Sequence, residues 1–180
     1  EGLSARGALW AAVIPDALAG RDICGRAPTG SGKTIAFGIP LVNGVGKASP
    51  KKPRGLVLVP TRELASQVCD ELNILAKPKG PWVEAFYGGV GFDKQLRALS
   101  KGVDIAVACP GRLADLINQR RMSLEDVEFV VIDEADRMAD MGFLPEVKRI
   151  LRHIRGQHQP LLVSATLDGV ADTPIARYQT

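Results

Sequence analysis

Short, unbroken apolar runs that recur along the chain constrain its fold more than any other feature of the sequence. They cover residues 56–59, 129–132 and 161–163, and residues 103–108 form a similar run in which Asp104 is the one polar residue. Runs of this length are typical of strands that are covered on both faces, as in a parallel sheet. Segments with apolar residues at helical spacing lie between them. This alternation predicts an α/β fold with a mainly parallel, doubly wound sheet and helices on both faces.

Local patterns indicate the remaining elements. The stretches 21–26 and 82–87 are further strand candidates. Apolar residues recur at helical intervals in several other segments, and glycines mark where two of the helices should end. We expect helices at 4–18 (ending at Gly20), from 35 to the region of Gly44 and Gly46, and at 64–75, 93–99, 112–119 and 143–154, with an exposed loop at 48–54. The length of 180 residues fits a single domain, 1–180.

Charge and cysteine content exclude some classes of protein. The net charge of +3 is a mild basic excess, which permits nucleic acid as a partner without requiring it. The three cysteines, Cys24, Cys69 and Cys109, show no paired ligand spacing, so we expect reduced thiols in a cytoplasmic protein. No apolar run reaches the length of a membrane span, and Glu1 is not followed by a basic signal region. We therefore expect no membrane association.

The stretch 27–34, Ala-Pro-Thr-Gly-Ser-Gly-Lys-Thr, has the composition of a phosphate-binding loop. It lies between a predicted strand and a predicted helix, which is the context that such a loop requires. Glycines let successive N–H groups turn toward one anion, and the positive end of the following helix adds to their field. Lys33 would reach the β- and γ-phosphates, and the Thr34 hydroxyl would hold Mg²⁺. The candidate nucleotide-binding residues are Ala27, Thr29, Gly30, Ser31, Gly32, Lys33 and Thr34.

Two carboxylates follow the apolar run 129–132 directly. Hydrolysis at a phosphate loop needs a metal link and a group that orients water. Asp133 stands where it could supply the metal link, and Glu134, the next residue, could act as general base. Alone, the pair would indicate only the acidic N-terminus of a helix, where carboxylates favour the helix dipole.

Several other polar motifs also come directly after predicted strands, so they should gather at the edge where ligands of such sheets bind. Arg62 and Arg112 each lie in a loop framed by Pro or Gly, and guanidinium groups suit phosphate oxygens. The pair Gly88-Gly89 lets a nucleic-acid strand approach the backbone closely. Taken singly, each arginine is equally consistent with a solvated side chain and the glycine pair with a turn.

Taken together, the motifs resemble those of DEAD-box RNA helicases, and they occur in the same order along nearly the whole chain. The residues that carry the resemblance are Ala27-x-Thr29-Gly30-Ser31-Gly32-Lys33-Thr34, Pro60-Thr61-Arg62-Glu63-Leu64-Ala65, Gly88-Gly89 with Gln95, Pro110-Gly111-Arg112, Asp133-Glu134-Ala135-Asp136 and Ser164-Ala165-Thr166. Ala27, which departs from the general phosphate-loop pattern, is usual in this family. The resemblance implies a RecA-like, ATP-binding first domain of an ATP-dependent RNA helicase.

The resemblance also implies roles for these residues. Lys33 and Thr34 would hold phosphate and Mg²⁺, Asp133 would be linked to Mg²⁺, and Glu134 would activate water. Asp136 would interact with Ser164 and Thr166 of the Ser-Ala-Thr motif, which couples ATP hydrolysis to unwinding in the family. Contact with RNA through phosphate and sugar implies little sequence preference, and the 2′-OH would separate RNA from DNA. The residues that would carry or shape the RNA path are Pro60, Thr61, Arg62, Gly88, Gly89, Gln95, Pro110, Gly111 and Arg112.

The chain departs from the family pattern in three places. Trp10 stands where the family has a Gln that reads adenine, and Arg6 stands where Pro is usual, so we expect weak discrimination between ATP and GTP. Cys109 replaces a usual Thr, which removes a hydroxyl from an RNA contact or is a tolerated packing exchange. The second RecA-like domain, whose arginines complete the ATP site, is absent before Thr180. We therefore expect the chain alone to bind nucleotide weakly, to hydrolyse it very slowly and not to unwind a duplex.

Two other functions are consistent with parts of this pattern. With Trp10 in place of Gln, the domain could bind RNA or act as a scaffold without using nucleotide. The phosphate loop alone would also suit another ATPase, such as a DNA translocase. The retention of Lys33, Thr34, Asp133 and Glu134 together favours nucleotide use, and the sequence does not indicate the oligomeric state.

Overall fold

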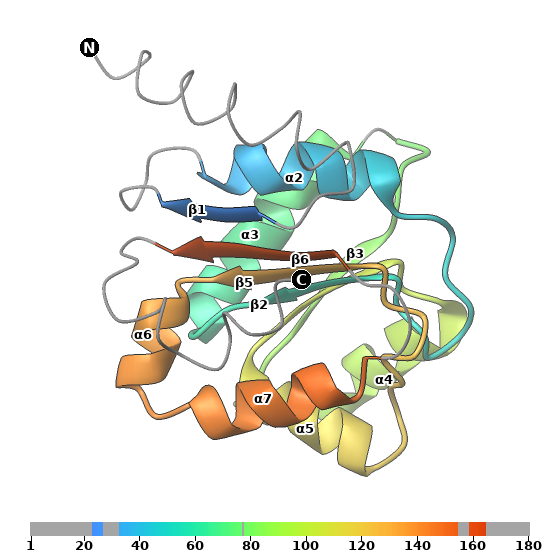
Figure 1. Ribbon diagram of the computed structural model, residues 1–180. Coiled ribbons are helices and arrows are strands. Elements are labelled where there is room, and N and C mark those ends of the chain that lie inside the picture. The colour runs from blue at the N-terminus through green and yellow to red at the C-terminus, as the bar shows by residue number, and fades with distance from the viewer. Residues whose placement is uncertain (1–22, 27–32, 77, 155–158, 165–180) are drawn as a thin grey trace.

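The structure is a computed structural model that describes residues 23–26, 33–76, 78–154 and 159–164 (Figure 1). Strands and helices alternate along nearly the whole of this part of the chain. The strands are β1 (Ile23–Arg26), β2 (Gly55–Leu58), β3 (Val83–Phe86), β4 (Ile105–Ala108), β5 (Phe129–Asp133) and β6 (Gln159–Ser164). The helices are α2 (Lys33–Gly44), α3 (Arg62–Leu75), α4 (Phe92–Lys101), α5 (Pro110–Asn118), α6 (Ala135–Asp140) and α7 (Leu144–Arg152). No helix among the described residues is long and apolar enough to cross a membrane.

The strands form one sheet in the order β1-β6-β5-β2-β4-β3, and every pairing in it is parallel. The prediction of a parallel, doubly wound α/β sheet is therefore confirmed. All strands end at the same edge, which lies on the left of Figure 1, where the arrowheads of β1, β6 and β5 point. The described segments that follow β2, β3, β4 and β5 lie along this carboxyl edge, as the sequence predicted.

Both faces of the sheet are buried, because successive side chains of a strand point to opposite faces. In β2, Leu56 and Leu58 pack against α4, α5, α6 and α7, whereas Val57 packs against α2 and α3 on the other side. This explains why the central strands are apolar at every position rather than at alternate ones. Figure 1 shows the two helical layers above and below the sheet.

The approach of α2 to α3 depends on a glycine. A Cβ added at Gly38 would lie 2.7 Å from Leu75 Cδ1 and 2.9 Å from Leu72 Cδ2. Both distances are too short for a real contact, so only glycine lets the two helices pack this closely without a shift of the leucines.

Most of the predicted elements are present, with boundaries that move by a few residues. The sequence missed α6, which follows β5 directly. The segment predicted as an exposed loop at 48–54 is only partly exposed, since Pro53 is buried and Arg54 is half-buried. The predicted helix at 4–18, with Arg6 and Trp10, lies outside the described residues.

The outer edge of the sheet is protected. β3 is the last strand on this side, and the carbonyl groups of Val83 and of Tyr87, the residue after the strand, accept hydrogen bonds from Cys69 Sγ (3.7 Å) and Gln95 Nε2 (3.2 Å). A short edge strand whose carbonyls are occupied in this way is a poor template for another strand.

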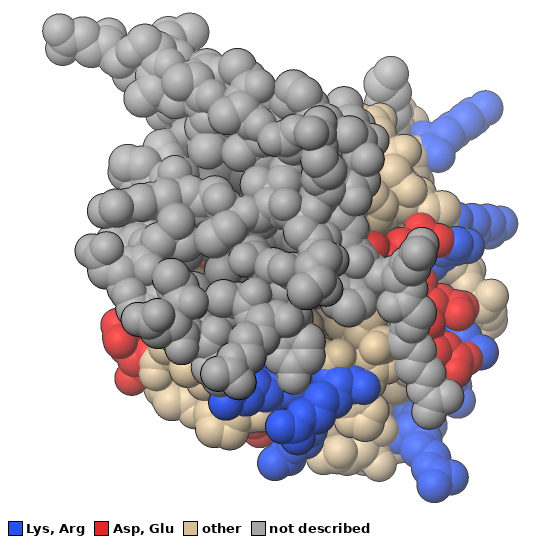
Figure 2. All heavy atoms as spheres, in the orientation of Figure 1, with Lys and Arg blue, Asp and Glu red and all other residues tan. Residues whose placement is uncertain are grey.

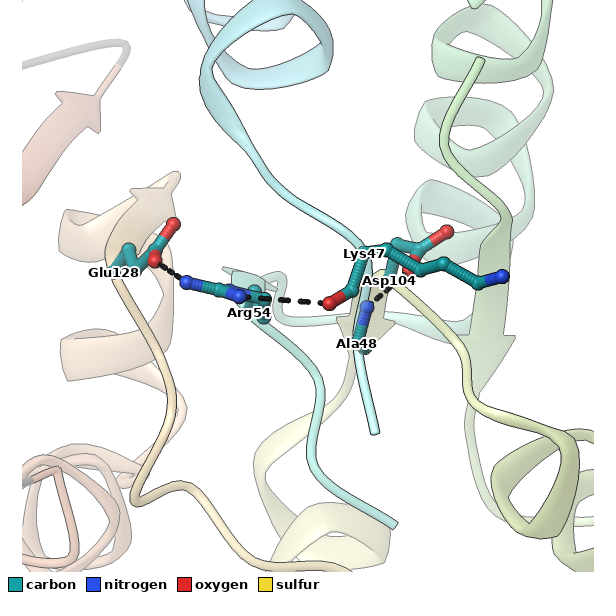
Figure 3. Close-up of polar contacts among 5 residues, drawn as sticks. All are labelled: Lys47, Ala48, Arg54, Asp104 and Glu128. Atoms are coloured by element: carbon teal, nitrogen blue, oxygen red, sulfur yellow. Dashed lines mark hydrogen bonds and ion pairs between the residues drawn. The ribbon is translucent and has the colours of Figure 1, made fainter. Parts of the chain in front are cut away.

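A polar cluster holds together the opposite, amino edge of the sheet (Figure 3). The Arg54 guanidinium forms an ion pair with Glu128, and Arg54 Nη1 donates to the carbonyl of Lys47 at 3.5 Å. The Asp104 carboxylate accepts from the N–H groups of Ala48 (2.6 Å) and Trp82 (2.8 Å). These contacts join the segment after α2 to the starts of β2, β3, β4 and β5.

Replacing Asp104 by Ala is expected to destabilise the chain by about 1–2 kcal/mol, because the partly buried N–H of Ala48 loses its acceptor, whereas the exposed N–H of Trp82 can bond to water. Asp104→Asn keeps one acceptor oxygen and should cost about half as much. Urea unfolding measures both changes, with Asp115→Ala as control, because Asp115 is exposed on α5 and should alter stability by less than about 0.5 kcal/mol. Equal stabilities of the Asp104 and Asp115 variants would contradict this role.

Candidate nucleotide and nucleic-acid site

The strands β1 and β5, which carry the predicted phosphate loop and the acidic pair, lie on either side of β6. Arg26, the last residue of β1, is paired with Ser164 of β6, and Asp133 of β5 is paired with Val163 of the same strand. Two strand spacings of about 4.8 Å place the ends of β1 and β5 about 10 Å apart. The end of β1, which precedes the predicted phosphate loop, and Asp133 therefore lie at one edge of the sheet, not at opposite ends.

The helix α2 begins at this edge (Figure 1) with Lys33 and Thr34. Thr34 lies in the first turn and is 9% exposed. The first N–H groups of a helix have no partner within the helix and favour an anion. The loop residues Ala27, Thr29, Gly30, Ser31 and Gly32 lie outside the described residues, so their predicted contacts stay predictions.

Asp133 ends β5 and is completely buried, while Glu134 is 7% exposed. Glu134 adopts a left-handed backbone conformation (φ 53°), which is uncommon for a residue with a side chain. Its carboxylate lies 3.6 Å from Arg137 Nη1, one turn further along α6. A left-handed residue with a side chain is strained, and such strain is typical of functional sites.

The donor groups at this edge fit Mg²⁺. A threonine hydroxyl and an aspartate carboxylate supply hard oxygen ligands, which Mg²⁺ prefers. No group of three or more His, Cys, Asp and Glu side chains in the described part of the chain could hold a metal by itself. Mg²⁺ usually takes few ligands from a protein and completes its shell with water and substrate phosphates, so this small donor set suits it.

Arg62 lies at the same edge, as the first residue of α3 rather than in the loop that the sequence predicted. Thr61 caps α3, and its hydroxyl accepts from the N–H of Leu64 at 3.2 Å. Arg62 is exposed, and its guanidinium carbon lies 5.6 Å from the centre of the Tyr87 ring. Pro60 is buried beside them. Arg62 is therefore held near the surface, where it can contact an anion.

The loop after β3 lies directly beside Arg62. Gly88 and Gly89 are exposed, and Gly89 has φ 80°, which glycine adopts without strain. A Cβ at Gly89 would lie 3.2 Å from Arg62 Nη1. The glycine therefore leaves room for the arginine as well as for a ligand.

Arg112 is fixed by three contacts. Its Nη1 donates to Gln95 Oε1 (2.9 Å), its Nη2 donates to the carbonyl of Val90 (3.0 Å), and its guanidinium lies 4.1 Å from the centre of the Phe92 ring. Gln95 is only 5% exposed, since its amide joins Tyr87 to Arg112. Gln95 therefore shapes the predicted RNA path from beneath, by fixing the arginine and the glycine loop together.

Sequence reasoning missed the aromatic residues in this arrangement. Tyr87 and Phe92 flank the glycine loop, and each lies under one of the two predicted arginines. Aromatic residues on both sides of a glycine pair are a signal that could have been read, because arginine stacks on aromatic rings.

Cys109 takes the N-cap position of α5, where its side chain makes no capping hydrogen bond. Burial, with a smaller contribution from the negative charge of Glu63, raises the pKa of its thiol to about 11. Burial also raises the pKa of Cys69 to about 11. Both thiols are therefore protonated near neutral pH and are poor nucleophiles and metal ligands.

The structure describes all but one of the remaining predicted site residues. Pro110 and Gly111 begin α5 beside Arg112. Asp136 lies half-buried in the first turn of α6, and Ser164 ends β6 at the carboxyl edge. Thr166 lies outside the described residues, so the predicted coupling of Asp136 to this motif stays a prediction.

Comparison with known proteins finds one matching family and several similar proteins. Residues 10–173 match the profile described as "DEAD/DEAH box helicase". The chain is 45% identical over 172 residues to the DEAD-box ATP-dependent RNA helicase CshA of Bacillus licheniformis, covering 96% of this chain and 35% of that protein. It is 51% identical over 158 residues to DEAD-box ATP-dependent RNA helicase 5 of Oryza sativa, covering 84% of this chain and 31% of that protein. The chain thus spans about a third of the length of these curated relatives.

A solved structure shows the same fold. The crystal structure of a DEAD box protein from the hyperthermophile Methanococcus jannaschii superposes with a TM-score of 0.85 at 37% identity, covering 93% of this chain and 46% of that one.

Proposed function

Since the chain belongs to the DEAD/DEAH box helicase family, we propose that it is the ATP-binding RecA-like domain of an ATP-dependent RNA helicase. In this proposal it binds ATP with Mg²⁺ and the backbone of RNA, and it remodels or unwinds RNA only together with a second RecA-like domain. The single observation that carries the proposal is the meeting of the phosphate-loop strand and Asp133 at one sheet edge.

The nucleotide end of the site is built from α2 and β5. The N–H groups at the start of α2 and Lys33 would bind the phosphates, and Thr34 and Asp133 would hold Mg²⁺, which neutralises phosphate charge when bound. Glu134 would accept a proton from the attacking water. Asp133 would hold the metal, and Glu134, which follows it in a backbone turn at φ 53°, would position the water.

The RNA end lies further along the same edge, at the loops after β2, β3 and β4. Arg62 and the N–H groups of the exposed glycines would contact phosphates, and Gln95 would keep Arg112 oriented. None of these groups reads a base in this arrangement, so binding should depend little on RNA sequence. A cytoplasmic location agrees with this function and is likewise a proposal.

Nucleotide and RNA titrations of the 180-residue chain test the proposal. A fluorescent ATP analogue should bind saturably and only with Mg²⁺. Lys33→Ala should weaken this binding by about 10- to 100-fold, because a charge-assisted contact contributes about 1.5–3 kcal/mol. Lys101→Ala is the control, because it removes an exposed lysine at the end of α4, and it should leave the affinity for the ATP analogue unchanged. Single-stranded RNA should bind more tightly than DNA of the same sequence.

Each alternative function gives a different result. An RNA-binding or scaffold module that does not use nucleotide would bind RNA without any saturable, Mg²⁺-dependent binding of the ATP analogue. A DNA translocase would bind the nucleotide but would not prefer RNA over DNA.

A further inference from the structure

A basic hollow of about 430 Å³ lies away from the carboxyl edge, and nothing in the predicted site uses it. Three separate segments form it: residues 50–52, residues 117–125 and the end of α7. Apolar and cationic side chains make up most of its lining. The lining residues are Pro50, Lys51, Lys52, Ile117, Arg120, Met122, Ser123, Leu124, Glu125, Arg152 and His153.

The hollow carries an excess of positive charge. Four cationic side chains face a single carboxylate, that of Glu125, which lies 2.5 Å from Lys52 Nζ. Within the described ranges, Lys51, Arg120 and Arg152 take part in no ion pair. Three positive charges around one depression favour an anionic ligand.

The lining of the hollow is held in shape by its backbone. Lys51 and Arg120 both adopt left-handed conformations, with φ 63° and 56°. The N–H of Lys51 donates to the carbonyl of Leu99 (2.9 Å), and its own carbonyl accepts from the N–H of Ser123 (2.8 Å). Because the lining is preorganised, a ligand loses less affinity to ordering of the loop.

The helix α5 connects the hollow to the predicted RNA path. Arg112 lies in its first turn at the carboxyl edge, and Arg120 follows its last turn at the hollow. The nine residues of α5 span about 13 Å at 1.5 Å per residue. An RNA strand that leaves the path along α5 would therefore reach the hollow within a short distance.

Basic side chains continue along the neighbouring helix. α7, which packs against α5, carries Lys148, Arg149 and Arg152. Figure 2 shows Lys and Arg side chains gathered on the face where Figure 1 places α7.

We propose that this hollow is a second RNA-backbone site, in which Lys51, Arg120 and Arg152 bind phosphates of a single strand that extends beyond the carboxyl-edge path. The proposal rests on the proposed function, because RNA is the polyanion that the path itself would deliver to the hollow. The apolar side chains of Ile117, Met122 and Leu124 offer a surface for a sugar or base between two bound phosphates.

The cations at helix ends have a structural role as well. Arg120 follows the end of α5 and Arg152 ends α7, where positive charge stabilises the helix dipole. That role affects the stability of the chain, but it does not affect how RNA affinity depends on salt. The salt dependence of RNA binding therefore distinguishes an RNA site from dipole compensation alone.

The test compares two double variants of the 180-residue chain. Arg120→Gln with Arg152→Gln removes two charges from the hollow. Arg97→Gln with Arg121→Gln is the matched control, because both arginines are exposed, neither lines the hollow and the charge change is the same. Binding of a long and a short single-stranded RNA is measured by fluorescence anisotropy over a range of salt concentrations.

For the long RNA, the hollow variant should reduce the slope of log affinity against log salt by about 1.4, since each phosphate contact contributes about 0.7. If the hollow variant and the unmodified chain bind equally at 1 M salt, this slope corresponds to affinity that is about 25-fold weaker at 0.1 M salt. The short RNA, which fills only the carboxyl-edge path, should bind the hollow variant and the control equally. Urea unfolding of both variants measures the separate effect on stability.

The outcomes separate this inference from the proposed function. If the hollow variant and the control bind long RNA with the same slope, the inference is overturned while the proposed function stands; a hollow that binds an acidic protein instead would give this result. If the unmodified chain binds no RNA at all, both are overturned. A reduced slope confined to the hollow variant and the long RNA supports the inference.

Discussion

Glu134→Gln is expected to slow ATP hydrolysis by about 10²- to 10⁴-fold while leaving nucleotide binding intact, because a general base contributes about that much to a rate. The exchange keeps the size of the side chain, and glutamine tolerates the turn at φ 53° no worse than glutamate does. The loss should therefore report the missing proton acceptor rather than a changed backbone. Single-turnover hydrolysis, with the chain in excess over ATP, measures the rate.

Asp140→Asn is the control for this variant. It makes the same charge change at the far end of α6, where Asp140 is exposed, and it should leave the rate unchanged. Turnover by Glu134→Gln at the unmodified rate would remove Glu134 from its proposed role. Loss of ATP binding by the same variant would indicate a role in holding the nucleotide instead.

The 180-residue chain alone is expected to hydrolyse ATP about 10³- to 10⁵-fold more slowly than the same chain joined to a second RecA-like domain. An arginine finger contributes about this factor in related phosphoryl-transfer enzymes, and the proposed site depends on arginines from the second domain. The measurement is steady-state phosphate release with saturating RNA, for the chain alone and for the joined form.

Glu134→Gln serves as the control in both forms, because it shows that the measured phosphate comes from this site. Robust RNA-stimulated hydrolysis by the 180 residues alone would contradict the dependence on a second domain. It would mean that Lys33, Asp133 and Glu134 are sufficient without added arginines.

The sheet and its functional edge could be predicted because their signals are strong and local. Strands buried on both faces must be apolar at each position, and β2 is buried throughout. Once the strands are parallel, their carboxyl ends share one edge, so the position of a motif after its strand was enough to place it. Arg62 and Arg112, in the first turns of α3 and α5, and the loop at Gly88 lie at that edge for this reason alone.

The features that the sequence did not predict depend on too few residues to form a pattern, or on contacts between residues far apart in the sequence. The helix α6 has six residues, too few for a periodic pattern, and it starts after Glu134, a residue type that gives no signal for a left-handed turn. Gln95 would ordinarily be expected at the surface. It is buried because its partners, Tyr87 and Arg112, lie on different elements, the second of them 17 residues away.

The cluster at the amino edge was missed for the same reason. Arg54 and Glu128 are 74 residues apart, and Asp104 joins a third segment to them through backbone N–H groups. The sequence predicts only an exposed loop at 48–54, since nothing near its charged residues indicates a partner.

The position of β6 has a consequence for how the domain is assembled. Among the described strands, β1 pairs only with β6, so that Ile23–Arg26 meet Leu161–Ser164 from the far end of the chain. During synthesis, β2, β3, β4 and β5 can come together while β1 still has no neighbour, because loop closure over such a separation comes late. β1, the strand that precedes the predicted phosphate loop, can therefore pair with the sheet only after residue 164 has been synthesised.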